Sequence, residues 1–157
     1  MGQQAFQDIL DVENHCWGCG SHNEHGLQVK SYWSGDEAVC TWQAKNYHAG
    51  GARHILNGGI IATIIDCHST CTAIAAAYRA EGREFGADPL IWYVTGSLQV
   101  TYLRPTLIKE PIVLRARVKK MEKKKAIVTC SLFAKGEECA RGEVVAVRVS
   151  KKSWGGP

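Results

Sequence analysis

One carboxylate stands out in this sequence because it lies inside a long apolar segment. Asp66 is the only acidic residue between Glu37 and Glu81, and its neighbours are mostly isoleucine, alanine and cysteine. Burying a carboxylate without a partner is costly, and burial raises its pKa toward the range of a useful general base. We therefore predict that Asp66 acts as a general base or nucleophile, with a structural hydrogen bond to a neighbouring strand as the alternative.

Two glycines open the same segment, at Gly58 and Gly59, and Asn57 precedes them. The first amides of a helix have no intrahelical acceptor, and with the helix dipole they attract developing negative charge. Glycine has no Cβ, so a substrate carbonyl can approach the backbone. Asn57 suits an N-cap, and its side chain is also a neutral donor for a carbonyl, so both roles stay open. We predict an oxyanion hole at Gly58 and Gly59.

The spacing of these residues predicts that one chain does not hold a complete site. Asp66 lies eight residues after Gly58, which corresponds to about 12 Å along one helix. This is too far for both to act on one carbon atom. A working site would combine Gly59 of one chain with Asp66 of another, so catalysis would require at least a dimer.

The elements that position these residues can be read from the hydrophobic pattern. Residues 58–81 predict one long helix, apolar on nearly all sides, which must be buried nearly all round. A short helix is expected at 3–13, and strands at 27–33, 37–44, 90–103, 111–121, 126–134 and 139–149. Strands joined by short turns form antiparallel sheets. The predicted fold class is α+β, with an antiparallel sheet wrapped around one long central helix.

Length, net charge and cysteine content narrow the class of protein to which this sequence belongs. The chain has 157 residues and a net charge of +4, which predicts one domain over 1–157, with an N-terminal helix and a Cys/Gly-rich entry loop at about 1–26. Seven cysteines without a visible signal peptide predict reduced thiols and a cytoplasmic location. No uninterrupted apolar run suggests a membrane partner, and aromatic residues do not interleave with the lysines as in nucleic-acid binders.

Three segments together resemble the hot dog fold and, within it, the PaaI-like acyl-CoA thioesterases. They are CWGCG at 16–20 followed by Gly26-Leu27, NGGIIATIID at 57–66, and VTGSLQVTYLRP at 94–105. The second resembles the family's helix-opening motif, His-Gly-Gly before an apolar run and an acidic residue. Asn57 departs from that motif, because the family usually has His there.

The resemblance implies hydrolysis of an acyl-CoA thioester to a carboxylic acid and free CoA, with no cofactor beyond the CoA of the substrate. It also implies a homodimer or dimer of dimers with active sites at the subunit interface. Thr95 falls where relatives often have a Ser or Thr that orients water or the carboxylate. Lys120 falls where some relatives use a lysine near the nucleotide.

Other residues are candidates for substrate binding, each with a plainer alternative. Thr70 lies one turn after Asp66 and shares its face. His48 would border the pocket mouth, Trp92 would line an acyl pocket, and Arg104 would contact CoA phosphates. Ordinary packing or solvation would account for the same residue types.

The entry loop also offers metal-ligand chemistry. Cys16 and Cys19 are spaced Cys-x-x-Cys, with His15, His22 and His25 close by. These ligands would form a very tight knuckle, and a second Cys-x-x-Cys is missing, so we expect no metal.

Two other functions remain open. Asn57 in place of His keeps a non-catalytic acyl-CoA-binding protein as an alternative. A hot dog hydratase or dehydratase is a second alternative, although such enzymes usually need a catalytic His beside the acid.

Overall fold

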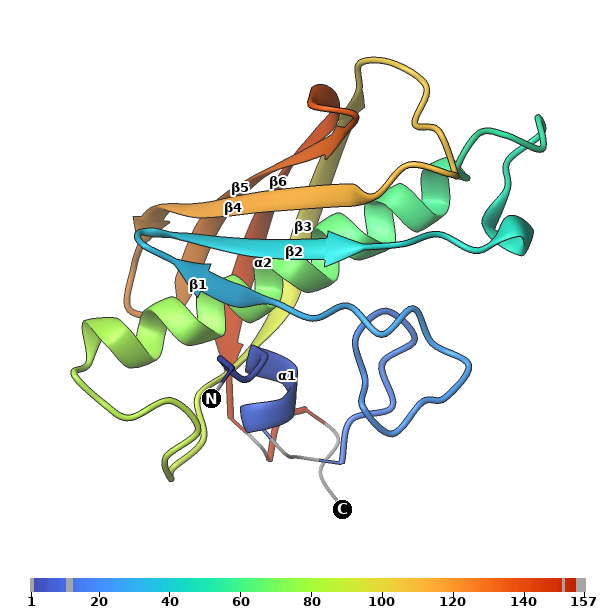
Figure 1. Cartoon of the computed structure of the whole chain (residues 1–157). Coiled ribbons are helices and arrows are strands. Elements are labelled where there is room, and N and C mark those ends of the chain that lie inside the picture. Colours follow the sequence, from blue (N-terminus) through green and yellow to red (C-terminus); the bar gives the residue numbers. More distant parts are fainter. Residues whose placement is uncertain (1, 11–12, 151, 155–157) are drawn as a thin grey trace.

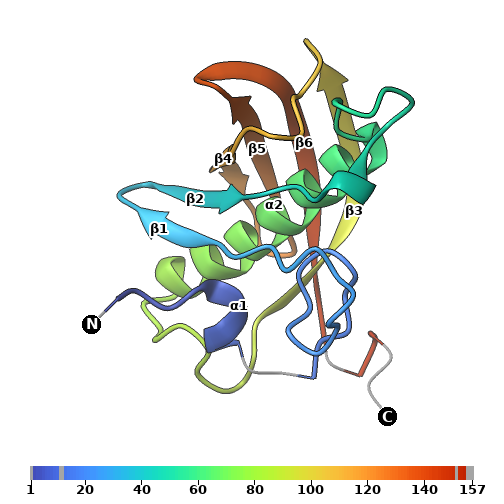
Figure 2. The same cartoon turned by 45° about the vertical axis from the view of Figure 1, so that its right-hand side comes forward.

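The computed structural model describes residues 2–10, 13–150 and 152–154. Helix α2 (Gly58–Ala80) lies at its centre, and a curved sheet surrounds much of it (Figures 1 and 2). The strands are β1 (Tyr32–Ser34), β2 (Glu37–Trp42), β3 (Trp92–Tyr102), β4 (Ile112–Met121), β5 (Lys125–Ala134) and β6 (Glu137–Val149). The short helices are α1 (Phe6–Ile9) and the 3-10 helix η1 (Asn46–His48).

The six strands form one sheet in the order β1-β2-β4-β5-β6-β3, and every neighbouring pair is antiparallel. Strand β3 follows the helix in the chain but pairs with β6, the last strand. The predicted antiparallel sheet around one long central helix is confirmed.

Other parts of the chain cover helix α2 because it carries apolar residues on most of its sides. Ile61, Ile64 and Ile65 are buried on one face of the helix, and Ile74 is buried on a different side. The helix is long and apolar enough to cross a membrane, but 72% of its most apolar window is buried inside the protein. We therefore describe it as the core helix of this fold.

The first predicted strand is shorter than expected. Only its last residues join the sheet, as β1, because the backbone before them is bound elsewhere. The Leu27 amide donates to the Trp17 carbonyl (2.8 Å), and the Val29 amide donates to the Gly18 carbonyl (3.0 Å). Residues 27–29 therefore belong to the entry loop.

The first predicted helix is also shorter, since α1 covers only Phe6–Ile9. Residues 11–12 of that prediction lie outside the described residues. The predicted turn between β1 and β2 is confirmed, because Ser34 pairs with Glu37 and Gly35 adopts a φ of 64°.

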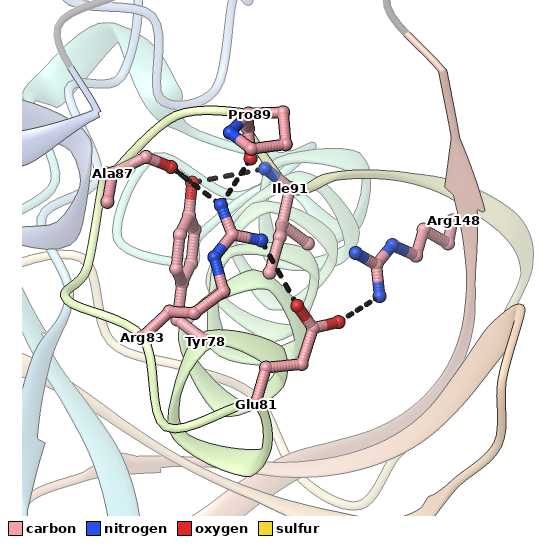
Figure 3. Close-up of polar contacts among 7 residues, drawn as sticks. All are labelled: Tyr78, Glu81, Arg83, Ala87, Pro89, Ile91 and Arg148. Carbon is pink, nitrogen blue, oxygen red and sulfur yellow. Dashed lines mark hydrogen bonds and ion pairs between the residues drawn. The ribbon is translucent and has the colours of Figure 1, made fainter.

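A polar network fixes the C-terminal end of α2 to the sheet (Figure 3). Glu81 accepts hydrogen bonds from Arg83 at 3.1 Å and from Arg148 of β6. The Tyr78 hydroxyl donates to the Ala87 carbonyl and accepts from the amide of Ile91, each at 3.1 Å. The loop that leads into β3 is thereby held against the helix, which helps to set where β3 begins.

A close approach of helix and sheet at Gly142 supplies a test of the packing. A Cβ added at Gly142 of β6 would lie 2.5 Å from Ile65 Cγ2, whereas one added at Gly51 would meet nothing within 4 Å. We expect Gly142→Ala to lower the free energy of unfolding by about 1–3 kcal/mol through overpacking. Gly51→Ala, the matched control, should change it by less than about 0.5 kcal/mol. Denaturant unfolding measures both, and equal effects would contradict the packing described.

Candidate functional site

Asp66 lies in the middle of α2 and receives a hydrogen bond from the sheet. The Thr95 hydroxyl of β3 donates to Asp66 Oδ1 at 2.5 Å. Thr70 Oγ1 lies 3.2 Å from Thr95 Oγ1. Because the proton of Thr95 is directed at the carboxylate, Thr70 must be the donor of this second bond. The three predicted residues therefore form one chain of hydrogen bonds that ends on the carboxylate.

An irregularity in β3 lies directly beside Thr95. Thr95 pairs with Ala146, but the next pair is Ser97 with Val145, so Gly96 is an extra residue in β3. A Cβ on Gly96 would lie 2.8 Å from a methyl of Val147, which explains why glycine occupies the bulge. Bulges redirect neighbouring side chains, and this one adjoins the residue that contacts Asp66.

The carboxylate of Asp66 is half-buried, and its environment alters its acidity. Burial raises the pKa of Asp66 above its usual value, and the nearby Cys16 thiol acts in the same direction. The hydrogen bonds from Thr95 and Thr70 oppose this shift, because they stabilise the charged form. This is the direction expected for a carboxylate placed among apolar residues.

The N-terminus of α2 is capped by Asn57. Its Oδ1 accepts from the amides of Gly59 (2.8 Å) and Ile60 (3.2 Å). The predicted cap is confirmed, but the Gly59 amide is consequently not free to bind an oxyanion in this structure. Within the described part of the chain, neither the Gly58 amide nor Asn57 Nδ2 donates a hydrogen bond, so these are the open donors.

The glycine at position 59 has a local explanation. A Cβ there would lie 3.0 Å from Asn57 Oδ1, so a larger residue would press on the capping side chain. Tyr102, at the end of β3, is a site residue that sequence reasoning missed. Its hydroxyl donates to the Gly58 carbonyl at 2.7 Å and so ties β3 to the opening of the helix. The Tyr-x-x-Pro pattern at 102–105 was the available signal.

His48 has a structural role instead of the predicted place at a pocket mouth. Its ring is buried against Trp42, with ring centroids 5.3 Å apart, and its Nδ1 accepts from the Lys45 amide at 3.0 Å. Burial and then Lys45 lower the pKa of His48, which favours the neutral ring. Its carbonyl accepts from the Asn57 amide at 3.0 Å, so its backbone helps to place the cap.

Among the described residues, the other candidates (Trp92, Arg104 and Lys120) form no hydrogen bond or ion pair with Asp66. Trp92 is partly buried and packs against the hydrophobic core. Arg104 forms an exposed ion pair with Glu137 at 3.3 Å, and Lys120 forms one with Glu122 at 2.6 Å. Both cations thus have acidic partners at the surface.

Comparison with known proteins places this architecture in a family. The model of the thioesterase superfamily matches residues 54–140, more than half of the chain. A thioesterase superfamily protein from Shewanella loihica is 35% identical, with 81% of this chain and 96% of that chain covered and a TM-score of 0.64. None of the curated proteins matches this chain.

More distant structures share the fold. The PaaI protein of the E. coli phenylacetic acid degradation operon is 13% identical, with 79% of this chain and 81% of that chain covered and a TM-score of 0.64. Thioesterase superfamily member 2 of zebrafish is 23% identical, with 92% and 93% covered and a TM-score of 0.63. This chain therefore belongs to the thioesterase superfamily, and its sheet-wrapped helix is the hot dog fold.

Proposed function

We propose that this protein hydrolyses acyl-CoA thioesters to a carboxylic acid and free CoA. The observation that carries the proposal is the Asp66 carboxylate, the one acidic side chain of a largely apolar helix, which accepts a hydrogen bond from Thr95. Superfamily membership supports thioester chemistry at the level of the reaction class.

The reaction uses one oxygen of Asp66 that Thr95 leaves free. Thr95 binds Oδ1, so Oδ2 is available to take a proton from water. The water oxygen attacks the thioester carbon, and the C–S bond breaks as the tetrahedral intermediate collapses. The thiolate of CoA then takes the proton from Asp66. In the nucleophilic alternative, Asp66 attacks the carbon itself and water hydrolyses the mixed anhydride.

Charge on the tetrahedral oxygen would be stabilised at the start of a helix. The open donors are the Gly58 amide and Asn57 Nδ2, since Asn57 Oδ1 already caps the helix. Asn57 Oδ1 thus caps the helix, while Asn57 Nδ2 would bind the oxygen of the tetrahedral intermediate. One side chain would serve both roles considered for it. An asparagine therefore meets the requirement without the histidine of the family motif.

Along one helix, these donors lie about 12 Å from Asp66, so we infer that the site is completed by a second copy of the chain. The exposed strand β3 supports pairing with a second copy. It is an edge strand without a charged residue or proline, unlike the very short β1 at the other edge.

The face of β3 that turns toward the helix is also uncovered. Leu98 and Tyr102 pair with Val144 and Ala140, which are buried on the helix side, yet Leu98 and Tyr102 are exposed. A second copy paired along β3 would cover this face and place one helix N-terminus near the other chain's Asp66. The result is a homodimer, with pairing of dimers as a further step.

Coenzyme A would bring its phosphates to the basic surface of a chain with net charge +4. Arg104 and Lys120 are the candidates for those phosphates, exchanging their carboxylate partners for the ligand. The reaction as written needs no metal or organic cofactor, and CoA esters are substrates of the cytoplasm, where we place the protein.

Asp66→Asn removes the base while preserving the shape of the side chain. We expect thioester hydrolysis to fall by about 10²–10⁴-fold, while a non-hydrolysable acyl-CoA analogue still binds. Thiol release from short, long and aryl acyl-CoAs measures the first effect, and calorimetry the second. Asp36→Asn, in the exposed β1–β2 turn, is the matched control and should retain full activity.

Full turnover by Asp66→Asn would remove Asp66 from the mechanism. Binding of CoA esters by the wild-type chain without any turnover would favour the binding-protein alternative.

Two substitutions at Asn57 separate capping from catalysis. Asn57→Asp keeps an oxygen for the helix amides but loses the Nδ2 donor, so hydrolysis should fall at nearly unchanged stability. Asn57→Ala loses both groups and should also lower the free energy of unfolding by about 1 kcal/mol. Turnover and denaturant unfolding are measured on both variants. Wild-type turnover by Asn57→Asp would show that the side chain only caps the helix.

A charge on β3 should disrupt the dimer. Leu98→Lys places an ammonium group on the exposed edge strand, so we expect a monomer with native circular dichroism and greatly reduced hydrolysis. Leu107→Lys is the matched control, since Leu98 and Leu107 are 37% and 38% exposed and Leu107 lies outside the strands. Light scattering gives the mass in solution. An active Leu98→Lys monomer would contradict a shared site.

A further inference from the structure

Three cysteine sulfur atoms converge beside Asp66. Cys16 and Cys19 come from the entry loop, and Cys67 comes from α2, immediately after Asp66. Their Sγ atoms all lie within 4.8 Å of one another, and those of Cys16 and Cys67 are 3.7 Å apart. We call these three residues the sulfur cluster. The sequence pattern pairs the first two with nearby histidines, whereas Cys67 comes from a distant segment.

The entry loop is closely fitted to the helix at this point. A Cβ on Gly18 would lie 2.2 Å from Cys67 Sγ, so glycine is what lets the loop backbone approach that sulfur. The Gly20 amide donates to the Cys16 carbonyl at 2.8 Å and closes the turn between the two loop cysteines. Gln28 Nε2 holds the Gly20 carbonyl at 2.9 Å. The loop is thus held in the conformation that brings the sulfurs together.

The loop histidines are engaged elsewhere. His15 Nε2 lies 3.0 Å from a carboxylate oxygen of Glu13, and His22 Nδ1 lies 3.2 Å from the Ser21 hydroxyl. Among the described residues, the group within common reach of one ion is therefore made of sulfur alone. Sulfur ligands select soft or borderline cations such as Zn²⁺ over Mg²⁺ or Ca²⁺.

The distances match one such ion. With Zn–S bonds of about 2.3 Å in a tetrahedron, two sulfur ligands lie about 3.8 Å apart. The separation of Cys16 and Cys67 is already 3.7 Å, and Cys19 needs only a small adjustment. Cys16 is exposed while the other two are buried, so one side of the cluster is open to solvent and a water molecule can reach it.

We propose that the sulfur cluster binds one Zn²⁺ per chain through Cys16, Cys19 and Cys67, with water as the fourth ligand. Each thiol that binds loses its proton to solvent as its S–Zn bond forms. The ion would join the entry loop to α2 next to Asp66 and stabilise the loop. Because the readouts below do not involve turnover, this site is tested separately from the hydrolase proposal.

Cobalt provides the direct test, because Co²⁺ bound to thiolates absorbs strongly in the near ultraviolet. The full chain, reduced and freed of metal by a chelator, is titrated with Co²⁺ without oxygen. We expect a charge-transfer band that saturates at one Co²⁺ per chain and disappears when one equivalent of Zn²⁺ is added. Thermal unfolding of the same protein should shift upward with Zn²⁺, because binding favours the folded state.

Variants assign the band to the cluster. Cys16→Ser lies in the exposed loop and should fold normally while losing most of the band, and Cys67→Ser should behave alike. Cys71→Ser, one turn further along the helix, is buried but outside the cluster and should keep the full band. Absence of a band in the reduced wild-type chain, or a band unchanged in both Cys16→Ser and Cys67→Ser, would overturn the proposal.

Discussion

The fold depends on one constraint, which is that helix α2 has almost no polar face to leave in water, only a narrow stripe that includes Asp66 and Thr70. Its buried isoleucines point in several directions, so a single packing layer cannot cover them. The curved sheet meets this requirement by contacting the helix from several strands (Figure 2). At Gly142 the helix side chain Ile65 packs so close to the strand backbone that a Cβ would not fit. Burial on this scale is the main source of stability in such a domain.

The same constraint makes Asp66 chemically distinctive. A carboxylate in a largely apolar helix needs partners, and two hydroxyl groups in series supply them, Thr95 from β3 and Thr70 from the helix itself. Of the two carboxylate oxygens, Thr95 contacts Oδ1. The surrounding burial raises the pKa, and the hydroxyls moderate that rise. Packing and chemistry are therefore linked, since the strand that covers the helix also orients its single acid.

Sequence reasoning located the helix to within a residue and gave nearly all of β4, β5 and β6, because those patterns are local. It also identified Asp66 as exceptional from its surroundings alone. The contact with Thr95 came from the family resemblance. Two features were out of reach because they join distant segments: the bulge at Gly96 and the approach of Cys67 to the entry loop. For the Tyr102 hydroxyl on Gly58, the Tyr-x-x-Pro pattern was a signal, but it does not name the partner. The hydrogen bond from the Gly59 amide to Asn57 Oδ1 depends on the rotamer of Asn57, which the sequence does not determine.

The strand order also determines when the site can form during synthesis of the chain. Asp66 and Thr95 are only 29 residues apart, yet within the described residues β3 pairs in the sheet with β6 alone, which comes after the other five strands in chain order. Until residues 137–149 are available, β3 has no neighbour in the sheet to hold it. The nascent chain therefore carries both residues early and assembles them late. A site built on Asp66 and Thr95 would therefore depend on β6 as well, although β6 contributes no residue to it.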